Sequence, residues 1–415
     1  MLWFALVMMT VFAALLIAKF CWCSRFISMV RGQASPSPSL ESELPRALVI
    51  LSLRGPDPFL RQTLQCLCAQ TVQDYDLRVI VDSETDPAWD ILQEFMEYAG
   101  ETRIDIRVLH RRLKTCSLKV SALIQEIAEL DECYRTVVLV DADAIPSPNW
   151  LRDLLTPLAD PPVGATCGLR WYMPAKRNLA DLVRCMWGAS AMEQMYQFQI
   201  AWGGSFAIKR ELFDRTNLLE HWSKCFSEDA SINQSLDELN LSLRYVPVIL
   251  VNKETTSLSG CFEFMRRQLF TVIRHHPNWQ GIAGYAFANF GVVLAAFTLM
   301  IYSAAFGELA TAGWFLAMVL SYASGVGLLT VWEDAAVRDR VRAQGGEVEP
   351  FHPESLLTLP LLVGLYAVCW ISALSLRRIQ WRGVSYELLP SGELQVVEDR
   401  PYRDLTPSCS EATVL

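Results

Sequence analysis

The strongest pattern in this chain is the placement of its long apolar runs, which lie near the start and in the last third of the sequence. Residues 2–18 form one such run, interrupted only by Thr10, and positive charges follow it. A cleaved signal peptide has the opposite order, with positive charges before the apolar run and a small-residue cleavage site after it. We therefore predict an uncleaved membrane anchor over residues 1–23, with its basic end in the cytosol.

A basic and then Pro/Ser-rich stretch over residues 24–45 is typical of a linker that leads away from a membrane. Residues 46–257 have the pattern of a water-soluble domain. Apolar runs of strand type lie at residues 47–51, 77–81, 136–140 and 243–250, and the clearest helical segments lie at 87–98 and 118–130. This alternation predicts an α/β domain with a mostly parallel sheet, which binds ligands at the carboxyl ends of its strands.

Residues 258–280 combine an apolar side with an opposite side that carries Arg266, Arg267 and Arg274. Because this segment directly precedes a membrane segment, we interpret it as an amphipathic helix in the membrane interface. Residues 281–376 contain three membrane segments, with a connecting loop at 333–355. Residues 377–415 form a polar tail, which we expect to be loosely ordered from residue 387 onward.

The three later segments conflict with the distribution of positive charge. If the soluble domain is cytosolic, three full crossings place the C-terminus on the other side of the membrane. The basic residues just after the last segment, Arg377, Arg378 and Arg382, favour the cytosolic side instead. Either one segment does not cross completely, or the positive-inside preference is overridden here.

The composition reflects two environments. Hydrophobic residues make up 52% of the chain and charged residues 20%, whereas soluble proteins contain about 45–50% and about 25%. The net charge of −9 disfavours nucleic acid as a partner, and 12 cysteines without a repeated spacing indicate reduced thiols. We expect an integral multi-pass membrane protein, with its soluble domain facing the cytosol and the lipid bilayer among its partners.

Acidic residues directly follow two of the predicted strands. One strand leads into Asp82, and Asp86 lies four residues further on. Another leads into Asp141 and Asp143, and such a pair presents two oxygen ligands to one divalent cation that also holds a diphosphate. A single aspartate at a strand end is explained by turn preference alone, but two strands that end in this way favour a ligand site.

A third acidic pair, Glu228 and Asp229, begins a helical stretch at residues 228–239. The helix dipole also favours acidic residues at this position, so the pair alone does not indicate a site. Upstream, residues 202–206 (Trp-Gly-Gly-Ser-Phe) place two glycines where the backbone either passes close to another group or makes a plain turn.

These acidic residues belong to a series of motifs that occurs in order over about residues 46–274, with one more near the C-terminus. The series consists of Leu53-Arg-Gly-Pro-Asp-Pro-Phe-Leu60, Asp82-Ser-Glu-Thr-Asp-Pro-Ala88, Lys119 at a helix start, Asp141, Gly204-Ser205 with Lys209-Arg210, Glu228-Asp229, and Trp381-Arg-Gly-Val-Ser-Tyr386. In this order the motifs resemble those of the membrane-bound family 2 glycosyltransferases, and within them the ceramide glucosyltransferases.

The resemblance implies an inverting, metal-dependent hexosyltransferase with a GT-A fold. It would transfer glucose or a similar hexose from a UDP-sugar to a membrane lipid such as ceramide. Asp86, or failing it Asp82, would contact the base or ribose of the donor. Asp141 and Asp143 would hold Mn²⁺ or Mg²⁺ against the diphosphate.

The resemblance also assigns the residues around the reacting groups. Asp229 would be the general base for the acceptor hydroxyl, with Glu228 beside it raising its proton affinity. Three further residues would lie at the nucleotide-sugar, namely Lys119, Gly204 and Arg267. Of these, the lysine and the arginine are candidates for contacts with the phosphates.

One motif departs from the family pattern. The family's R-x-x-R-W or Q-x-x-R-W falls on Arg267-Gln-Leu-Phe270-Thr271, so phenylalanine and threonine replace the second arginine and the tryptophan. Arg266 or Arg274 is then the candidate for the missing charge. Two alternative functions stay open, which are transfer to a polyprenyl phosphate or a polysaccharide, and an inactive membrane scaffold.

Overall fold

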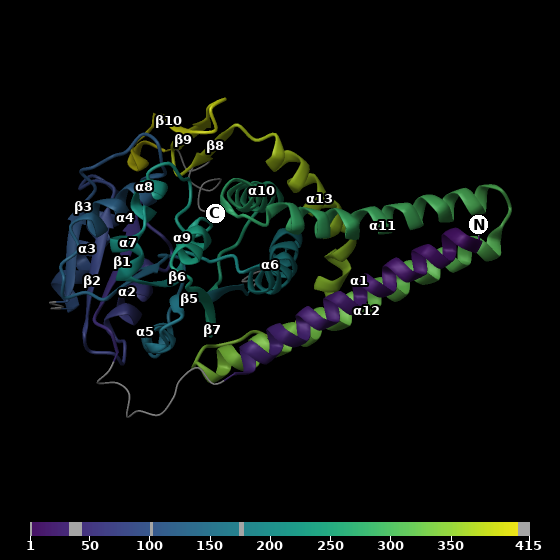
Figure 1. Cartoon of the computed structure of the whole chain (residues 1–415), viewed down its shortest axis with the longest axis horizontal. Coiled ribbons are helices and arrows are strands. Elements are labelled where there is room, and N and C mark those ends of the chain that lie inside the picture. The colour runs from purple at the N-terminus through teal and green to yellow at the C-terminus, as the bar shows by residue number, and fades with distance from the viewer. Residues whose placement is uncertain (1, 33–43, 100–102, 174–177, 406–415) are drawn as a thin grey trace.

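The computed structural model describes residues 2–32, 44–99, 103–173 and 178–405, and within them an α/β domain carries a protruding group of long helices (Figure 1). The domain is built on a seven-stranded sheet with the order β3-β2-β1-β4-β6-β5-β7. The strands are β1 (Ala47–Leu53), β2 (Tyr75–Val81), β3 (Ile104–Val108), β4 (Thr136–Val140), β5 (Val163–Tyr172), β6 (Ser205–Lys209) and β7 (Ser242–Asn252). Only β6 runs antiparallel to its neighbours among these strands, so the predicted mostly parallel sheet is confirmed.

Helices connect the strands of this sheet. They are α2 (Leu60–Cys68), α3 (Pro87–Ala99), α4 (Leu118–Ala128), α5 (Trp150–Leu155) with the 3₁₀ turn η2 (Thr156–Ala159), α6 (Leu179–Phe198), α7 (Arg210–Arg215), α8 (Leu218–Trp222) and α9 (Ile232–Glu238). All five residues of β4 are buried, because central strands of a sheet covered on both faces contact only protein. By contrast, β3 lies at the edge, and its Ile-Asp-Ile-Arg-Val sequence mixes charged with apolar residues, which explains why the apolar pattern did not reveal it.

Three long helices project from the domain, as Figure 1 shows. They are α1 (Leu2–Arg31), α11 (Trp279–Ala305) and α12 (Leu309–Ala343). Far from the domain they share an apolar contact zone that includes Phe12, Ala296 and Phe315. All three are long and apolar enough to span a membrane, as is a fourth segment at Pro353–Leu374. The predicted membrane anchor and later membrane segments are thus present as helices.

Two boundaries differ from the sequence-based expectation. Helix α1 continues to Arg31, so the first residues of the expected linker at 24–45 are helical; residues 33–43 lie outside the described residues. Helix α12 continues to Ala343, so the expected loop at 333–355 begins later. The physical reason is packing, because Phe26 and Val30 of α1 and Val337 of α12 are part of the domain's own core.

The third expected membrane segment takes a different course. After α12 the chain stays on the domain: Gln344 accepts a hydrogen bond from Ile249 N–H, and the 3₁₀ turn η3 (Pro353–Thr358) packs against α6. Helix α13 (Leu359–Leu374) then has 16 residues, which extend about 24 Å, less than the roughly 30 Å of a bilayer core. Beyond it, Arg382 contacts Asp57 of the domain. Both ends of α13 therefore lie next to the domain. If α13 is the segment that does not cross the membrane, the basic residues that follow it lie on the cytosolic side, as the positive-inside preference requires.

Helix α10 (Leu258–His275) corresponds to the expected interfacial helix. Its apolar side, which includes Phe264 and Met265, packs against α6, α11 and α13. That side is covered by protein rather than left free for lipid, because α13 lies along it.

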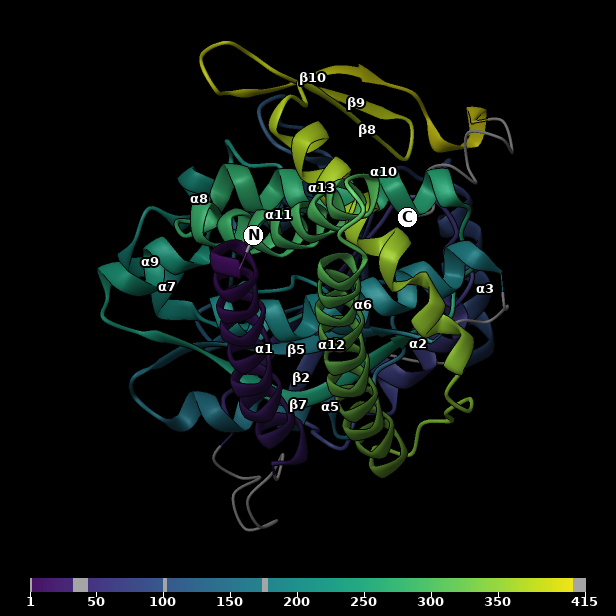
Figure 2. The same cartoon turned by 90° about the vertical axis from the view of Figure 1, so that its right-hand side faces the viewer.

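The polar tail contains an antiparallel sheet, and its last strand lies within the residues from 387 onward that we expected to be loosely ordered. Strands β8 (Arg378–Trp381), β9 (Val384–Leu388) and β10 (Leu394–Asp399) form an antiparallel sheet beyond α13, which Figure 2 shows at one side of the molecule. Tyr386 on β9 is fully buried, its ring meets that of Phe226 edge-on at 5.2 Å, and its hydroxyl accepts a hydrogen bond from Leu118 N–H. This sheet is therefore packed on the end of the domain where α4 begins.

Candidate active site

The acidic residues of the two predicted strand ends lie at the same edge of the sheet. Asp82 directly follows β2, and Asp141 directly follows β4. Strand β1 lies between these strands and is parallel to both, so their carboxyl ends point the same way. The two acidic groups nevertheless line different cavities, as described below.

Lys119 joins the acidic residues of β4 to those that precede α9. Its Nζ lies 2.8 Å from Asp141 Oδ1 and 2.7 Å from Glu228 Oε1. Ser117 caps the helix that carries it, by accepting a hydrogen bond from Val120 N–H. Burial alone raises the pKa of Asp141, but Lys119 and Arg170 outweigh it and hold the pKa below its usual range. Asp141 is therefore ionised, with one oxygen already committed to the lysine.

The Gly203-Gly204 turn passes directly against both acidic groups. A Cβ atom at Gly203 would lie 2.0 Å from Glu228 Oε1, and one at Gly204 would lie 2.4 Å from Asp141 Oδ2. A Cβ atom at Gly204 would also lie 2.2 Å from the Trp202 ring. These distances are too short for any side chain, so glycine is required here by close approach to the carboxylates and to this ring rather than by a plain turn.

Asp229 is held in a fixed orientation by its neighbours. Its Oδ2 accepts a hydrogen bond from Gly203 N–H at 2.8 Å, and its Oδ1 accepts one from Ala230 N–H at 2.7 Å and another from the Ser227 hydroxyl. The adjacent Glu228 is turned toward Lys119, and although burial raises its pKa, the lysine opposes that effect.

A polar cavity of about 170 Å³ contains most of the predicted site residues. Its lining includes Lys119, Asp141, Asp143, Glu228, Asp229 and Arg267. Gly204 is not part of the lining, but it forms the turn against Asp141. Thus the structure brings the predicted metal ligands, the predicted base and both predicted phosphate contacts into one place.

Two cations of this cavity were missed by the sequence analysis. Arg170 on β5 lies 3.6 Å from Asp143 and stacks on the Trp202 ring at 5.0 Å. Arg382, in the β8–β9 turn, lies in the cavity wall and binds both carboxylate oxygens of Asp57. Arg382 belonged to a recognised motif without an assigned role, whereas no pattern marked Arg170.

The carboxylates of the polar cavity fit a divalent cation. Oδ2 of Asp143 accepts a hydrogen bond from the side-chain amide of Asn252. The other oxygen of Asp143 and both carboxylate oxygens of Glu254 are buried without a hydrogen-bond partner. Burial and the nearby carboxylates of Asp143 and Asp57 raise the pKa of Glu254 to about 8. No three potential ligands converge among the residues that the structure describes, so a cation here would need oxygens of a diphosphate or water to complete its coordination.

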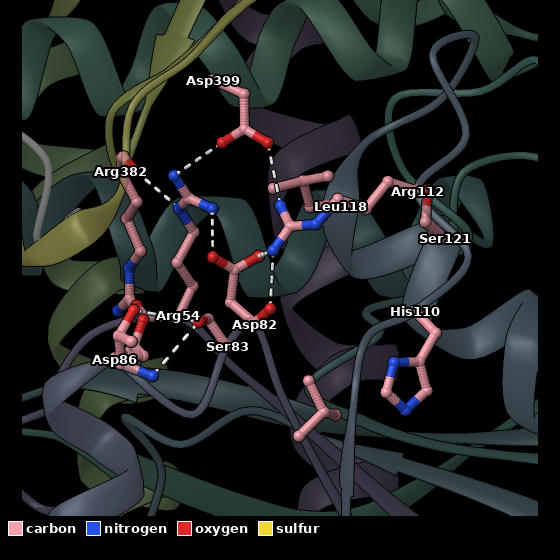
Figure 3. A network of polar contacts seen from close by, with 12 residues as sticks. Arg54, Asp82, Ser83, Asp86, His110, Arg112, Leu118, Ser121, Arg382 and Asp399 are labelled. Atoms are coloured by element: carbon pink, nitrogen blue, oxygen red, sulfur yellow. Dashed lines mark hydrogen bonds and ion pairs between the residues drawn. The ribbon is translucent and has the colours of Figure 1, made fainter.

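Asp82 and Asp86 are bound within the protein, as Figure 3 shows. The Asp82 carboxylate is shared by Arg54 and Arg112, and both arginines also bind Asp399 of β10. Asp86 accepts hydrogen bonds from Gly55 N–H and from Ala88 N–H. The two aspartates line a separate cavity of about 160 Å³ beside Tyr402. The structure therefore does not place them in the polar cavity with Asp141, and their contact with a nucleotide stays a prediction.

The altered fourth motif lies on α10. Phe270 is buried and meets the Phe226 ring at 6.4 Å, while Thr271 lines the polar cavity. Neither arginine expected to supply the missing charge lies there, since Arg266 is paired with Glu263 and Arg274 is exposed. The extra positive charge in the cavity comes from Arg170 and Arg382 instead.

A second, mostly apolar cavity of about 230 Å³ adjoins the polar one. Its walls come from α6, α10, α11 and α13, with Trp187, Leu269, Ile282 and Leu362 among the lining residues. Six residues line both cavities, namely Arg170, Tyr172, Trp202, Asp229, Gln268 and Thr271. Asp229 thus lies where a polar space and an apolar space meet.

Comparison with known proteins agrees with this architecture. The model of glycosyl transferase family 21 matches residues 5–394. No curated protein matches the chain. Among solved structures, a mannosyltransferase from Pyrobaculum calidifontis in complex with GDP-Man and Mn²⁺ is 19% identical, with a TM-score of 0.51, and the match covers 81% of this chain and 97% of that one. Glucosyl-3-phosphoglycerate synthase from Mycobacterium tuberculosis, in complex with Mn²⁺, UDP-Glc and glycerol 3-phosphate, is 14% identical with a TM-score of 0.40 over 59% of this chain and 85% of that one.

Proposed function

This chain belongs to glycosyl transferase family 21 and is a membrane glycosyltransferase with a GT-A fold, and we propose that it transfers a hexose such as glucose from a UDP-sugar to a membrane lipid such as ceramide. The transfer inverts the configuration of the sugar and depends on a divalent cation. Its domain faces the cytosol, in line with the basic residues that follow the anchor.

The observation that carries this proposal is the position of Asp229 at the junction of the two cavities. A nucleotide-sugar is polar and anionic. The polar cavity offers it four cationic side chains, which are Lys119, Arg170, Arg267 and Arg382, and its carboxylates would face the diphosphate through a divalent cation. A lipid keeps its tails in apolar surroundings and presents a hydroxyl group, which suits the cavity beside the membrane helices. The two substrates would then meet at a carboxylate.

The cationic residues have distinct places around the donor. We assign Arg267 and Arg382 to the diphosphate, because guanidinium groups bind phosphate oxygens in pairs. Burial lowers the pKa of Arg267 to about 10, which still leaves it charged at neutral pH. Lys119 holds Asp141 and Glu228 in place and stabilises their negative charge near the departing diphosphate.

Asp141 and Asp143, with Glu254 nearby, are the residues that would hold Mn²⁺ or Mg²⁺. The proposal is supported by the Mn²⁺ in the Pyrobaculum mannosyltransferase structure. A bound divalent cation would act as a Lewis acid on the diphosphate leaving group.

Asp229 is the proposed general base. It removes the proton of the acceptor hydroxyl while that oxygen attacks the anomeric carbon and the bond from this carbon to the diphosphate breaks. Two backbone N–H groups fix its carboxylate, so the base is oriented before the acceptor arrives. Glu228 is engaged by Lys119, which leaves Asp229 as the carboxylate directed at both substrates.

Replacing Asp229 with asparagine tests this assignment. We expect D229N to lower kcat for lipid glycosylation by about a hundredfold to ten-thousandfold, the usual contribution of a general base, while UDP-sugar binding persists. The matched control is D237N, the same change at an exposed position of α9, which should leave the rate unchanged. Near-normal transfer by D229N would refute the assignment of the base.

A further inference from the structure

The apolar cavity contains a group of charges that the proposed transfer does not use. Lys19 of α1 and Glu193 of α6 line this cavity, and Glu333 of α12 lies behind them. Lys19 Nζ contacts Glu193 Oε2 and lies 3.2 Å from Glu333 Oε1. All three side chains are almost completely buried. Charges are rarely placed in such surroundings without a partner for each group.

The charges in this group do not balance while both carboxyl groups are ionised, and burial together with the nearby Glu333 raises the pKa of Glu193 to about 7. One ammonium group faces two carboxylates, and Glu333 alone offers both of its oxygens to Lys19. Glu193 uses only Oε2 for the lysine, and its Oε1 is buried without a hydrogen-bond partner. A buried acceptor of this kind is costly unless a ligand supplies a donor. The structure therefore holds an unfilled hydrogen-bonding position in the wall of an apolar cavity.

Several other polar groups of this wall have partners, but the hydroxyl of Tyr172, which lines both cavities, is buried without one. The Tyr322 hydroxyl donates to Asn289 Oδ1, and Asn289 Nδ2 donates to the carbonyl oxygen of Tyr285 at 2.7 Å. Gln194 Oε1 accepts a hydrogen bond from the Tyr366 hydroxyl at 3.2 Å. Glu193 and Tyr172 are thus the lining residues that have a buried oxygen without a partner. A hydroxyl can donate as well as accept, whereas a carboxylate oxygen only accepts, so Glu193 is the one that requires a donor, and it lies in the same cavity as Asp229.

We propose that Glu193 Oε1 accepts a hydrogen bond from the acceptor lipid, given by an amide N–H or a second hydroxyl set back from the hydroxyl that receives the sugar. The proposal rests on the proposed function, because it places the lipid in the cavity that reaches Asp229. Glu193 would then determine specificity. A lipid with only ester oxygens at this position would place an acceptor oxygen against Glu193 Oε1 without a proton between them, and would be rejected.

The test compares three synthetic lipids with the same tails. The first is an N-acyl amino diol, the second replaces its amide N–H by an ester oxygen, and the third lacks the second hydroxyl. We expect the wild-type protein to favour the first lipid, in kcat/KM, over the second or the third by about tenfold to a hundredfold. The lipid that is disfavoured shows whether the amide or the hydroxyl is the donor.

Variants of the cluster decide whether Glu193 is responsible. E193A and E193L, which remove the acceptor oxygen, should reduce this preference to about threefold or less, whereas E333Q, which alters the same cluster from outside the cavity, should keep it. Because each value is a ratio within one variant, partial loss of folded protein does not affect it. A wild type without preference, or a preference retained by both Glu193 variants, would overturn the proposal.

A binding measurement separates this inference from the proposed function. The ratio of dissociation constants for the same three lipids is measured with full-length D229N in lipid nanodiscs. Discrimination by D229N that disappears in the D229N/E193L double variant supports the lipid site even if no transfer is found with any UDP-sugar. Equal binding of the three lipids contradicts the site, whatever the outcome of the activity assay.

Discussion

Gly204 lies at the point where the chain passes closest to the metal-ligand candidates. Its backbone contacts Asp141, and the neighbouring Gly203 donates its N–H to Asp229. The two glycines therefore let one turn position both the donor side and the acceptor side of the site. A side chain at either position would push a carboxylate away from its place.

We expect the substitution G204A to lower glycosyl transfer by at least about tenfold, because its Cβ would lie 2.2 Å from the Trp202 ring and 2.4 Å from Asp141 Oδ2. The matched control is G284A on α11, where no atom lies within 4 Å of an added Cβ and alanine favours the helix. Transfer rates with both variants, at equal amounts of folded protein, check this prediction. Equal activity of G204A and G284A would contradict the close approach.

The sequence predicted those site residues that occupy a recognisable position in the chain, either at the end of an apolar strand or within an ordered motif. Asp141 and Asp143 could be found because they end a uniformly apolar strand, and Lys119 and Asp229 because they occur in an ordered series of motifs. Arg170 and Glu254 carry no such signature, since they enter the cavity only through the pairing of β5 with its neighbours and the chain's course after β7. Asp82 had the right pattern, but its arginine partners come from other segments.

At the scale of elements, the β8–β9 hairpin completes the polar cavity. Arg382 and Gly383 form its turn, and both have positive φ angles of 45° and 79°. A non-glycine residue in this conformation is strained and is retained where its side chain is needed. Here that side chain reaches Asp57 and the carbonyl oxygen of Arg54.

Removal of this side chain should weaken donor binding. We expect R382A to raise KM for the UDP-sugar by about tenfold or more, since a guanidinium–phosphate contact is lost, and R382K to recover part of the loss. R378A, on the exposed side of the same hairpin, should leave KM unchanged. Kinetics at saturating lipid measure these effects, and an unaltered KM in R382A would show that the hairpin does not contact the donor.

The strands of the C-terminal tail could not be predicted from the local sequence pattern. Strands β8–β10 have only four to six residues each, so no long apolar run distinguishes them from an unstructured tail. Their order comes from distant partners, such as Val396 N–H donating to the carbonyl oxygen of Lys114, and the Arg54 and Arg112 pairs with Asp399. The long helices were predicted well because apolar length alone identifies them, whereas their ends at Arg31 and Ala343 depend on packing against the domain.

At the scale of the whole molecule, the path of α13 determines on which side of the membrane the C-terminus lies. Three helices project from the domain, and α13 begins and ends next to it. The C-terminal sheet must lie on the domain's side, because it contributes Arg382 to the polar cavity.

Reporter sites placed along the full-length chain test this topology. We expect a glycosylation acceptor site inserted at the Gly307 turn between α11 and α12 to be modified in the lumen, whereas one appended after residue 415 should remain unmodified. The control is a site inserted at the exposed Gly345, which should behave like the C-terminal one. A C-terminal site modified together with the Gly307 site would mean that α13 crosses the membrane.

In the proposed reaction an anionic donor and a lipid acceptor meet at one carboxylate, Asp229, and product analysis tests this most directly. Purified full-length protein is incubated with radiolabelled UDP-glucose, Mn²⁺ and a lipid mixture that contains ceramide, diacylglycerol and polyprenyl phosphate, and the products are separated by thin-layer chromatography. We predict one labelled product that migrates as a monohexosyl derivative of ceramide and is absent with D229N. Label found only in a polyprenyl phosphate derivative, in a polymer or in free glucose would contradict the account.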